Sequence, residues 1–306
     1  MANEIFHNVG GISDLRLSAI LTTEVQRLIA DRASLWGHPA FRLVGDVAGT
    51  GSNVIDQQQA GLDGYDLMAS VAENASSTNT ALTDSSPSTT ASRQALQRQI
   101  SDTYRMTGGP GGIDIDRLAF DMAGAAQMRG TELLCSVGDD FSTTKGTTTV
   151  AMSLDDWIDA QFALTQAKVP AALAVLYPKQ FTDLQNSLIG ISGPMQFVPA
   201  TQDLLNQAGQ GFVGTLNGVP IYLSSHVPTA NGGADSAGFM AGVGAIGKAI
   251  GTPPALRGAE GVNVDRFIQC ELERDASGGL TKIVGSAWMG TAILLDGAGV
   301  SIVTDR

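Results

Sequence analysis

The clearest pattern of apolar positions lies between Asp114 and Gly138. Apolar residues recur there every three or four positions, which predicts one helix of about six turns with a single apolar stripe. Two acidic residues suit its first turn, and Gly138 suits its end. The residues around the stripe are small, so we expect a sheet to approach this helix closely. The predicted stripe consists of Leu118, Met122, Ala125, Ala126, Arg129 and Leu133.

A second helical pattern covers residues 13–36, where Leu17, Leu21 and Val25 form a stripe. It ends at the break Trp36-Gly37-His38-Pro39. Two interpretations stay open. This segment is either an arm that packs on a neighbouring subunit or an ordinary first core helix.

Residues 42–104 have a different composition, because 13 of the 30 residues from Asn74 to Thr103 are Ser or Thr. Short extended runs at residues 41–47, 54–58, 67–71 and 89–100 predict a long two-stranded excursion. An isolated hairpin is marginally stable in water, so the excursion would need support from outside its own chain. A flexible polar linker is the alternative. The candidate subunit-contact residues are Asp56, Gln57, Tyr65 and Asp66 in the excursion, together with Trp36.

The next part of the chain predicts a mixed α/β region. Ser153 begins a helix with Asp156 at the capping-box position. Residues 171–177 predict a buried strand, and residues 179–188 and 200–207 predict short helices. The expected buried residues of the first helix are Leu154, Trp157, Ile158, Phe162 and Thr165.

Strand patterns dominate the remainder of the chain. Asn217-Gly218 is the favoured dipeptide of a two-residue hairpin turn within residues 212–228, and Pro220 belongs at a strand end or edge. Residues 268–272 alternate in polarity, and residues 280–288 return after a glycine-rich turn. Residues 291–295 and 300–304 predict two more strands. We expect this sheet to pack against the helix at 114–138.

Composition and charge exclude several classes of protein. Charged residues form 16% of the 306-residue chain, against about 25% in typical soluble proteins. A net charge of −12 argues against a general nucleic-acid binder, which needs a basic surface. No apolar run is long enough to cross a membrane, and the N-terminal residues do not resemble a signal peptide. Cys135 and Cys270 are expected to be buried free thiols, which suits a reducing compartment.

Candidate chemistry is sparse. Residues 209–214 match G-x-G-x-x-G but precede a hairpin instead of a helix. Residues 242–249 approach a phosphate-binding P-loop, yet Ala249 replaces the hydroxyl that would bind Mg²⁺. The three histidines are scattered, and the acidic pairs at 139–140 and 155–156 read as helix ends. We therefore predict no catalytic residue, no cofactor and no metal.

The order of these predicted parts resembles the major capsid proteins of tailed double-stranded DNA bacteriophages, which have the Hong Kong 97 fold. The Gly214-Thr-Leu-Asn-Gly218-Val-Pro220 hairpin, the following Val227-Pro228 and the closing strands with Gly285 to Gly290 carry the resemblance. It implies an α+β fold with an N-terminal arm, an extended loop, a peripheral domain with a long spine helix, and an axial domain.

The resemblance also implies boundaries and partners. Residues 1–41 would be the arm, 42–106 the extended loop, 107–142 the spine of the peripheral domain, 143–256 the axial domain, and 257–306 strands mainly of the peripheral domain. Such a protein assembles as pentamers and hexamers into an icosahedral shell around DNA, without binding DNA specifically. About forty residues precede the loop, so a separate scaffolding protein is expected, and a portal and a decoration protein are the other expected partners. The expected location is the virion capsid, after assembly in the host cytoplasm.

Some family members join their subunits through a lysine in the extended loop, but the first lysine here is Lys145, so no such bond is expected. Three alternatives compete with the capsid reading. An encapsulin nanocompartment has the same fold, a P-loop-like nucleotide-binding enzyme belongs to another class, and a polar β-rich adhesin is the third.

Overall fold

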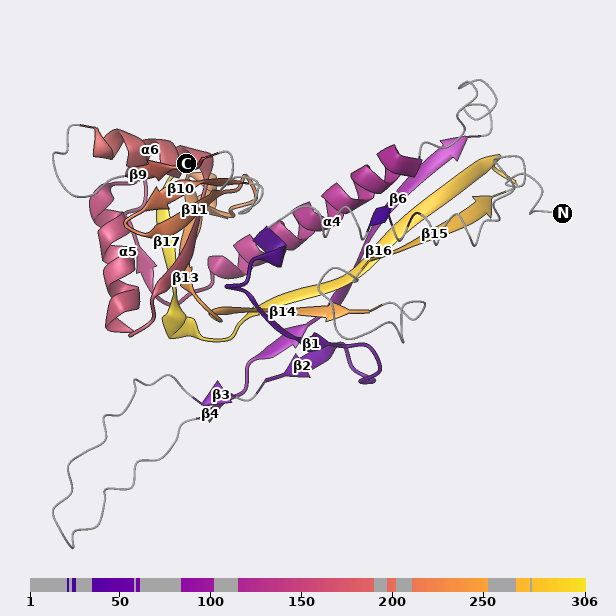
Figure 1. Ribbon diagram of the computed structural model, residues 1–306, viewed down its shortest axis with the longest axis horizontal. Coiled ribbons are helices and arrows are strands. Elements are labelled where there is room, and N and C mark those ends of the chain that lie inside the picture. Colours follow the sequence, from indigo (N-terminus) through magenta and orange to yellow (C-terminus); the bar gives the residue numbers. More distant parts are fainter. Residues whose placement is uncertain are drawn as a thin grey trace, which may run out of the picture.

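The computed structural model describes residues 21, 24–25, 35–57, 59–60, 84–101, 115–189, 197–201, 211–252, 268–275 and 277–306. Two large β-sheets lie on opposite sides of the described structure, and one long helix leads from one sheet to the other (Figure 1). The fold is mixed α and β, as the sequence predicts.

The long helix α4 spans Ile115–Gly138, which confirms the helix predicted at 114–138. Its predicted stripe faces the five-stranded sheet: Met122 is 1% exposed, and the Cys270 thiol lies 3.7 Å from the Met122 sulfur. Thr291 of the same sheet donates a hydrogen bond to the Leu133 carbonyl. The small residues of the helix therefore let the sheet approach, as expected.

The five-stranded sheet is built around β16, its longest strand. β14 and β15 pair antiparallel with β16, β6 pairs with it as well, and β1 adds parallel to β14. In Figure 1, β6, β15 and β16 run beside α4. The strands are β1 (Arg42–Asp46), β6 (Ser92–Ser101), β14 (Ile246–Gly251), β15 (Ile268–Asp275) and β16 (Leu280–Ile293).

A short 3₁₀ helix, η1 (Leu35–Gly37), packs on another side of α4. Trp36 is 2% exposed, and a Cβ atom added to Gly130 would lie only 2.8 Å from its ring. The helix predicted at 13–36 falls mostly outside the described residues. Its described members Leu21 and Val25 are helical and buried in the same core as Trp36.

The eight-stranded sheet has the order β7-β17-β13-β8-β11-β10-β9, and β12 pairs with β13. Helices α5 (Leu154–Gln166) and α6 (Pro178–Leu188) cover one face and share a core with it. The opposite face contributes Val175 and Phe239 to the core around α4. The strands are β7 (Thr144–Lys145), β8 (Ala171–Leu176), β9 (Phe197–Pro199), β10 (Phe212–Leu216), β11 (Val219–Leu223), β12 (Thr229–Ala230), β13 (Asp235–Gly242) and β17 (Gly299–Asp305).

The β10–β11 hairpin confirms the predicted turn. Asn217 and Gly218 both have positive φ, at 50° and 80°, as a two-residue hairpin turn requires. Strand β11 lies inside the sheet between β10 and β8, but β8 pairs only from Ile221 onward. Pro220, which lacks an N–H group, therefore lies near the start of β11, where no residue of β8 pairs with the strand.

Besides α4, which leads from β6 to β7, two short segments connect the two sheets. The turn after β13 leads directly into β14, and the short helix η4 (Asp296–Ala298) connects β16 to β17. The two crossings touch, because the Leu294 N–H donates to the Ala245 carbonyl at 2.9 Å. Strand β14 lies in the range 143–256 that was predicted as axial, yet it pairs in the five-stranded sheet. Strand β17 lies in the range 257–306 that was predicted as mainly peripheral, yet it pairs in the eight-stranded sheet.

Three other predictions differ from the structure. Residues 280–293 form one strand, so the separate strand predicted at 291–295 is wrong, and the strand predicted at 300–304 joins the other sheet. Helix α5 has the predicted Ser153 and Asp156 capping box, but its buried residues are Trp157, Ala160 and Leu164. Ile158 and Phe162 are exposed. The extended run predicted at 67–71 lies outside the described residues, as does most of the helix predicted at 200–207.

A narrow two-stranded ladder begins against the five-stranded sheet, where β5 contacts β14 and β16, and its β3–β4 end lies away from both sheets (Figure 1). β2 (Val54–Asp56) pairs with β5 (Ser88–Thr90), and β3 (Gln59–Ala60) pairs with β4 (Asp84–Ser85). The described part of the predicted excursion is therefore two-stranded. The predicted range 42–106 also includes β1 and β6, which are strands of the five-stranded sheet.

Gln180 joins helix α6 to the eight-stranded sheet. Its buried Nε2 lies 2.9–3.0 Å from three acceptors that share its two hydrogens, namely the carbonyls of Ser236 and Ile302 and the Thr304 hydroxyl. Its Oε1 accepts from the Tyr177 N–H at 3.0 Å. All the polar atoms of this amide have partners, although the side chain is fully buried.

We predict that Gln180→Leu lowers the free energy of unfolding by about 3 kcal/mol, because buried acceptors lose their donor. Urea denaturation followed by circular dichroism measures the change. Gln185→Leu, on the exposed side of the same helix, is the control and should change stability by less than about 0.5 kcal/mol. Equal effects of the two substitutions would contradict the importance of this hydrogen-bond network.

Candidate functional site

The projecting ladder presents backbone and polar side chains with little core of its own. The Gln57 N–H donates to the Pro87 carbonyl at 3.0 Å, and the Ala91 N–H donates to the Asn53 carbonyl at 2.8 Å. Asp56 is exposed, whereas Gln57 is half-buried and its Oε1 is a buried acceptor that none of the described groups satisfies. Tyr65 and Asp66, the other predicted contacts here, lie outside the described residues.

Trp36 differs from the other predicted contact residues, because the structure places it in the interior of its own chain. Its ring packs against α4 at Gly130. A residue that is 2% exposed offers almost no surface to a neighbour. The interpretation of Trp36 as a core residue therefore replaces its interpretation as a subunit contact.

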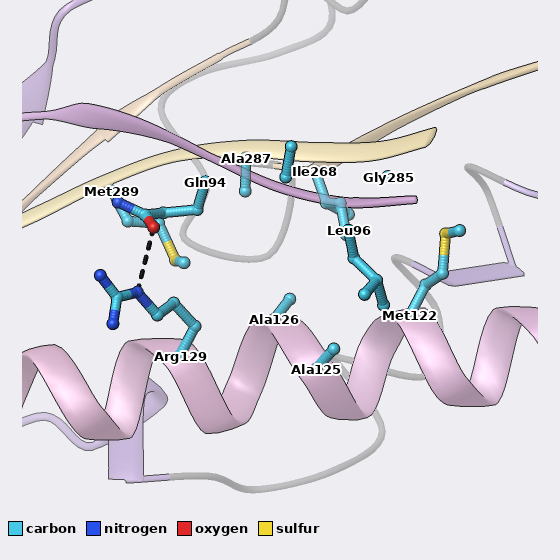
Figure 2. Close-up of a pocket in the computed structure, with 11 residues that line it drawn as sticks. Gln94, Leu96, Met122, Ala125, Ala126, Arg129, Ile268, Gly285, Ala287 and Met289 are labelled. Atoms are coloured by element: carbon cyan, nitrogen blue, oxygen red, sulfur yellow. Dashed lines mark hydrogen bonds between the residues drawn. The ribbon is translucent and has the colours of Figure 1, made fainter. Parts of the chain in front are cut away.

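A groove of about 310 Å³ lies between α4 and the five-stranded sheet. In Figure 2, Arg129 and Gln94 approach each other at one end, and the small side chains of Ala125 and Ala126 point toward the strands. The Arg129 Nε donates to the Gln94 Oε1 at 3.0 Å, and Arg129 also pairs with Glu132 at 2.8 Å. The remaining walls are mostly apolar, so the described residues of this groove include no nucleophile, acid or base positioned for catalysis. These walls come from Ala95, Leu96, Met122, Ile268, Gly285, Ala287 and Met289.

A second hollow of about 440 Å³ lies where α4 meets the end of β11. Phe120 and Met128 of α4 line it and are more than half exposed. Ser224 and His226 line its other side. This hollow also lacks a charged pair or a nucleophile next to a base among its described residues.

The segment that approached a P-loop does not form one. Residues 246–251 are strand β14, and the preceding glycines form the turn after β13. Lys248 is 2% exposed; its Nζ donates to the Trp36 carbonyl and lies 5.7 Å from the centre of the Trp36 ring. The ammonium group therefore serves the core, and the nucleotide-binding interpretation is not supported. Gly211 likewise leads into strand β10 instead of a helix.

Both cysteine thiols lie in the protein interior. Cys135 and Cys270 are buried and free, as predicted. Burial raises the pKa of the Cys135 thiol to about 12, so it is not a nucleophile at neutral pH. Within the described part of the chain, no three His, Cys, Asp or Glu side chains gather as a metal site would require. None of the described helices combines the length and apolar character needed to cross a membrane.

The exposed side of α5 is a surface that the sequence analysis missed. Ile158 and Phe162 lie one turn apart and are 37% and 57% exposed. Asp155 and Asp159 are exposed on the same helix, which contains no basic residue. The sequence showed that both sets of residues are apolar. It did not show which of the two adjacent apolar stripes of the helix faces the core.

Comparison with known proteins gives matches in structure alone. No protein-family profile matches the chain, and no curated protein matches its sequence. The capsid of cyanophage P-SCSP1u aligns with a TM-score of 0.58 and 12% identity over 90% of this chain and 89% of that one. The mature capsid of bacteriophage PhiM1 gives 0.58 and 11% over 89% and 87%. The holo-SrpI encapsulin of Synechococcus elongatus PCC 7942 gives 0.59 and 15% over 86% and 84%.

These alignments cover nearly the whole of each chain, so they define the architecture and not a single shared motif. The protein has the fold of capsid and encapsulin shell proteins. More particularly, this is the Hong Kong 97 fold that the order of sequence elements predicted. Helix α4, β15 and β16 lie in the ranges predicted as peripheral, and all strands of the eight-stranded sheet except β17 lie in the range predicted as axial, so the domain assignment itself stays a prediction. The numerical domain boundaries stay predictions.

His38 generates a prediction about pH. Its ring lies edge-on to the ring of Tyr222 in β11, with 5.3 Å between the ring centres. Its Nδ1 accepts a hydrogen bond from the Ala40 N–H at 3.2 Å. Burial, and then the nearby Lys248 ammonium, lower the pKa of His38 below its usual 6.5. The folded state thus binds the proton less well than the unfolded state. Its stability should be full above about pH 6.5 and decline as the pH falls from there toward the lowered pKa.

Melting temperatures of the wild type and of His38→Gln, measured between pH 8 and pH 5, test this. The wild type should lose more stability on acidification than the variant. Parallel curves for the two proteins would show that His38 makes no contribution.

Nucleotide binding should be absent. Because Lys248 is buried in β14, millimolar ATP with Mg²⁺ should leave the melting temperature of the wild type unchanged. A rise in melting temperature that disappears in Lys248→Met would restore the nucleotide-binding hypothesis.

Proposed function

We propose that this protein is a structural shell subunit, a major capsid protein that assembles as pentamers and hexamers into an icosahedral shell around double-stranded DNA. The observation that carries the proposal is the match to shell proteins along about nine tenths of the chain. It is supported by the lack of a catalytic arrangement in either described hollow. A non-enzymatic role follows from the same proposal.

Three physical features support a shell role. The β3–β4 end of the ladder lies away from both sheets, and a neighbouring subunit would support it. Large apolar side chains, including Phe162 and Met128, are exposed. The net charge of −12 would keep packaged DNA from adhering to the inner wall.

The proposal extends to partners and to the way subunits are joined. A separate scaffolding protein, a portal and a decoration protein are the proposed partners, and the virion capsid is the proposed location after assembly in the host cytoplasm. Residues 1–144 contain no lysine. Subunits should therefore be held by noncovalent contacts, without an isopeptide bond from the loop.

An encapsulin-type compartment is the second candidate, because an encapsulin gives a TM-score of 0.59, close to those of the phage capsids. Encapsulin and capsid shells share their fold, so fold comparison does not separate the two functions. The contents of the particle do separate them.

We expect the full chain, expressed with its neighbouring genes, to form closed particles visible by negative-stain electron microscopy. Their subunits should separate to a single band of 31.6 kDa in denaturing electrophoresis. Nuclease-protected DNA inside the particles would support the capsid function, and an enzyme cargo would support the encapsulin alternative. A protein that stays monomeric under all assembly conditions would contradict both, and a ladder of covalent multimers would contradict noncovalent joining.

A further inference from the structure

Strand β6 forms an open edge of the five-stranded sheet. All ten of its residues pair with β16 on one side, in a register without a bulge, and the described residues place no strand on its other side. Six of the ten residues are exposed, so solvent reaches this strand. It contains no Pro and no Lys, which natural edge strands often use to prevent pairing with another chain. The edge can therefore accept a further strand.

Strand β15 forms the opposite edge. It pairs with residues 280–287 of β16, and β6 pairs with residues 280–289 of the same strand. A strand has room for one neighbour on each side, so β6 and β15 lie on opposite sides of β16 (Figure 1). The β15 register also lacks a bulge, and the described residues place no strand on its outer side. One sheet thus has two regular open edges.

The directions of these two edge strands suit pairing between copies of the chain. β6 and β15 each run antiparallel to β16, so they run parallel to each other. When a second copy is placed so that the sheet continues, β6 of one copy meets β15 of the next as a parallel strand, along up to the eight residues of β15. A contact between two different edges repeats from copy to copy and can close into a ring.

The charges of the two strands favour pairing of unlike edges. β6 contains Arg93 and Arg98 and no acidic residue. β15 contains three acidic residues and one Arg, and the acidic residues are Glu271, Glu273 and Asp275. Like charges on neighbouring strands are destabilising. Two β6 edges or two β15 edges would bring like charges together, whereas β6 beside β15 brings unlike charges together.

The charged side chains that can meet lie on the same face of the sheet. The Arg98 side chain points toward α4 and forms an ion pair with it at 2.6 Å. Because side chains alternate along a strand, Arg93 lies on the face away from α4. Glu271 and Glu273 lie on that face as well, because the Cys270 thiol contacts α4. All three of these outer side chains are exposed.

We propose that β6 of one subunit pairs with β15 of the next subunit as parallel strands, so that the five-stranded sheet continues from copy to copy. Arg93 of one subunit then lies on the same face as Glu271 and Glu273 of its neighbour. This inference rests on the proposed shell function and assigns one contact between its subunits.

Cysteine cross-linking in assembled particles tests this contact. Gln97→Cys and Glu273→Cys each place a thiol at an exposed position on the face away from α4, and the native Cys135 and Cys270 are buried. Neighbouring residues of paired strands lie within the distance that a disulfide spans. Particles assembled from a mixture of the two full-length variants and treated with a mild oxidant should give a disulfide-linked dimer in non-reducing electrophoresis. Each variant assembled alone should give only monomer.

The register of the contact is tested in the same way. A shift of two residues keeps the same face of the strand, so Ala95→Cys and Gln99→Cys are each mixed with Glu271→Cys and with Glu273→Cys. The control mixes Glu273→Cys with Gln185→Cys, an exposed position of α6, and should give no dimer. A dimer in this control as abundant as in the other mixtures would show random collision and overturn the assignment.

The remaining outcomes separate the contact from the shell function. Normal particles without a dimer from any β6 and β15 mixture would overturn the contact and leave the shell function intact. Dimers from a single variant assembled alone would show that like edges meet, which would overturn the pairing of β6 with β15. A wild type that never assembles in the same runs would overturn the inference together with the shell function.

Discussion

Close packing of α4 on more than one side is the constraint on which the rest of the structure depends. The five-stranded sheet lies against its Met122 side, and Trp36 lies against Gly130. Any side chain at Gly130 would meet the Trp36 ring, and any side chain at Gly138 would meet the Phe239 ring. Because Phe239 belongs to β13, the last residue of the helix already contacts the second sheet. One helix thereby fixes the positions of both sheets, and the surfaces they present to neighbours depend on it.

The exposed apolar side chains can be interpreted once this packing is known. A single exposed phenylalanine is ordinary on a soluble protein. Ile158 and Phe162 differ because they lie together on a helix whose other apolar stripe is already buried. The half-buried Gln57 in the ladder similarly has an acceptor that none of the described groups satisfies. Both features are easier to understand in a subunit than in an independent globule.

Features that depend on nearby residues were predictable from the sequence. The length of α4, the Asn217-Gly218 turn and the Ser153 capping box follow from local spacing and turn chemistry. Features that depend on distant partners were not. The role of Lys248 is set by the carbonyl of Trp36, 212 positions away. The strand at 299–305 follows β16 closely in sequence but joins another sheet, because pairing with β13 satisfies its backbone there. Trp36 was misplaced for the same reason.

The double crossing between the sheets also has a mechanical meaning. β13 continues into β14 and β16 continues into β17, so two strand segments connect the domains in parallel, in addition to α4 between β6 and β7. Each segment is anchored at both ends by antiparallel ladders, β13 with β17 and β14 with β16. Tension that pulls the domains apart is shared among these connections, and in the two strand segments it acts along the strands. Many ladder hydrogen bonds must then shear together, whereas a single flexible linker would transmit the same force through one chain.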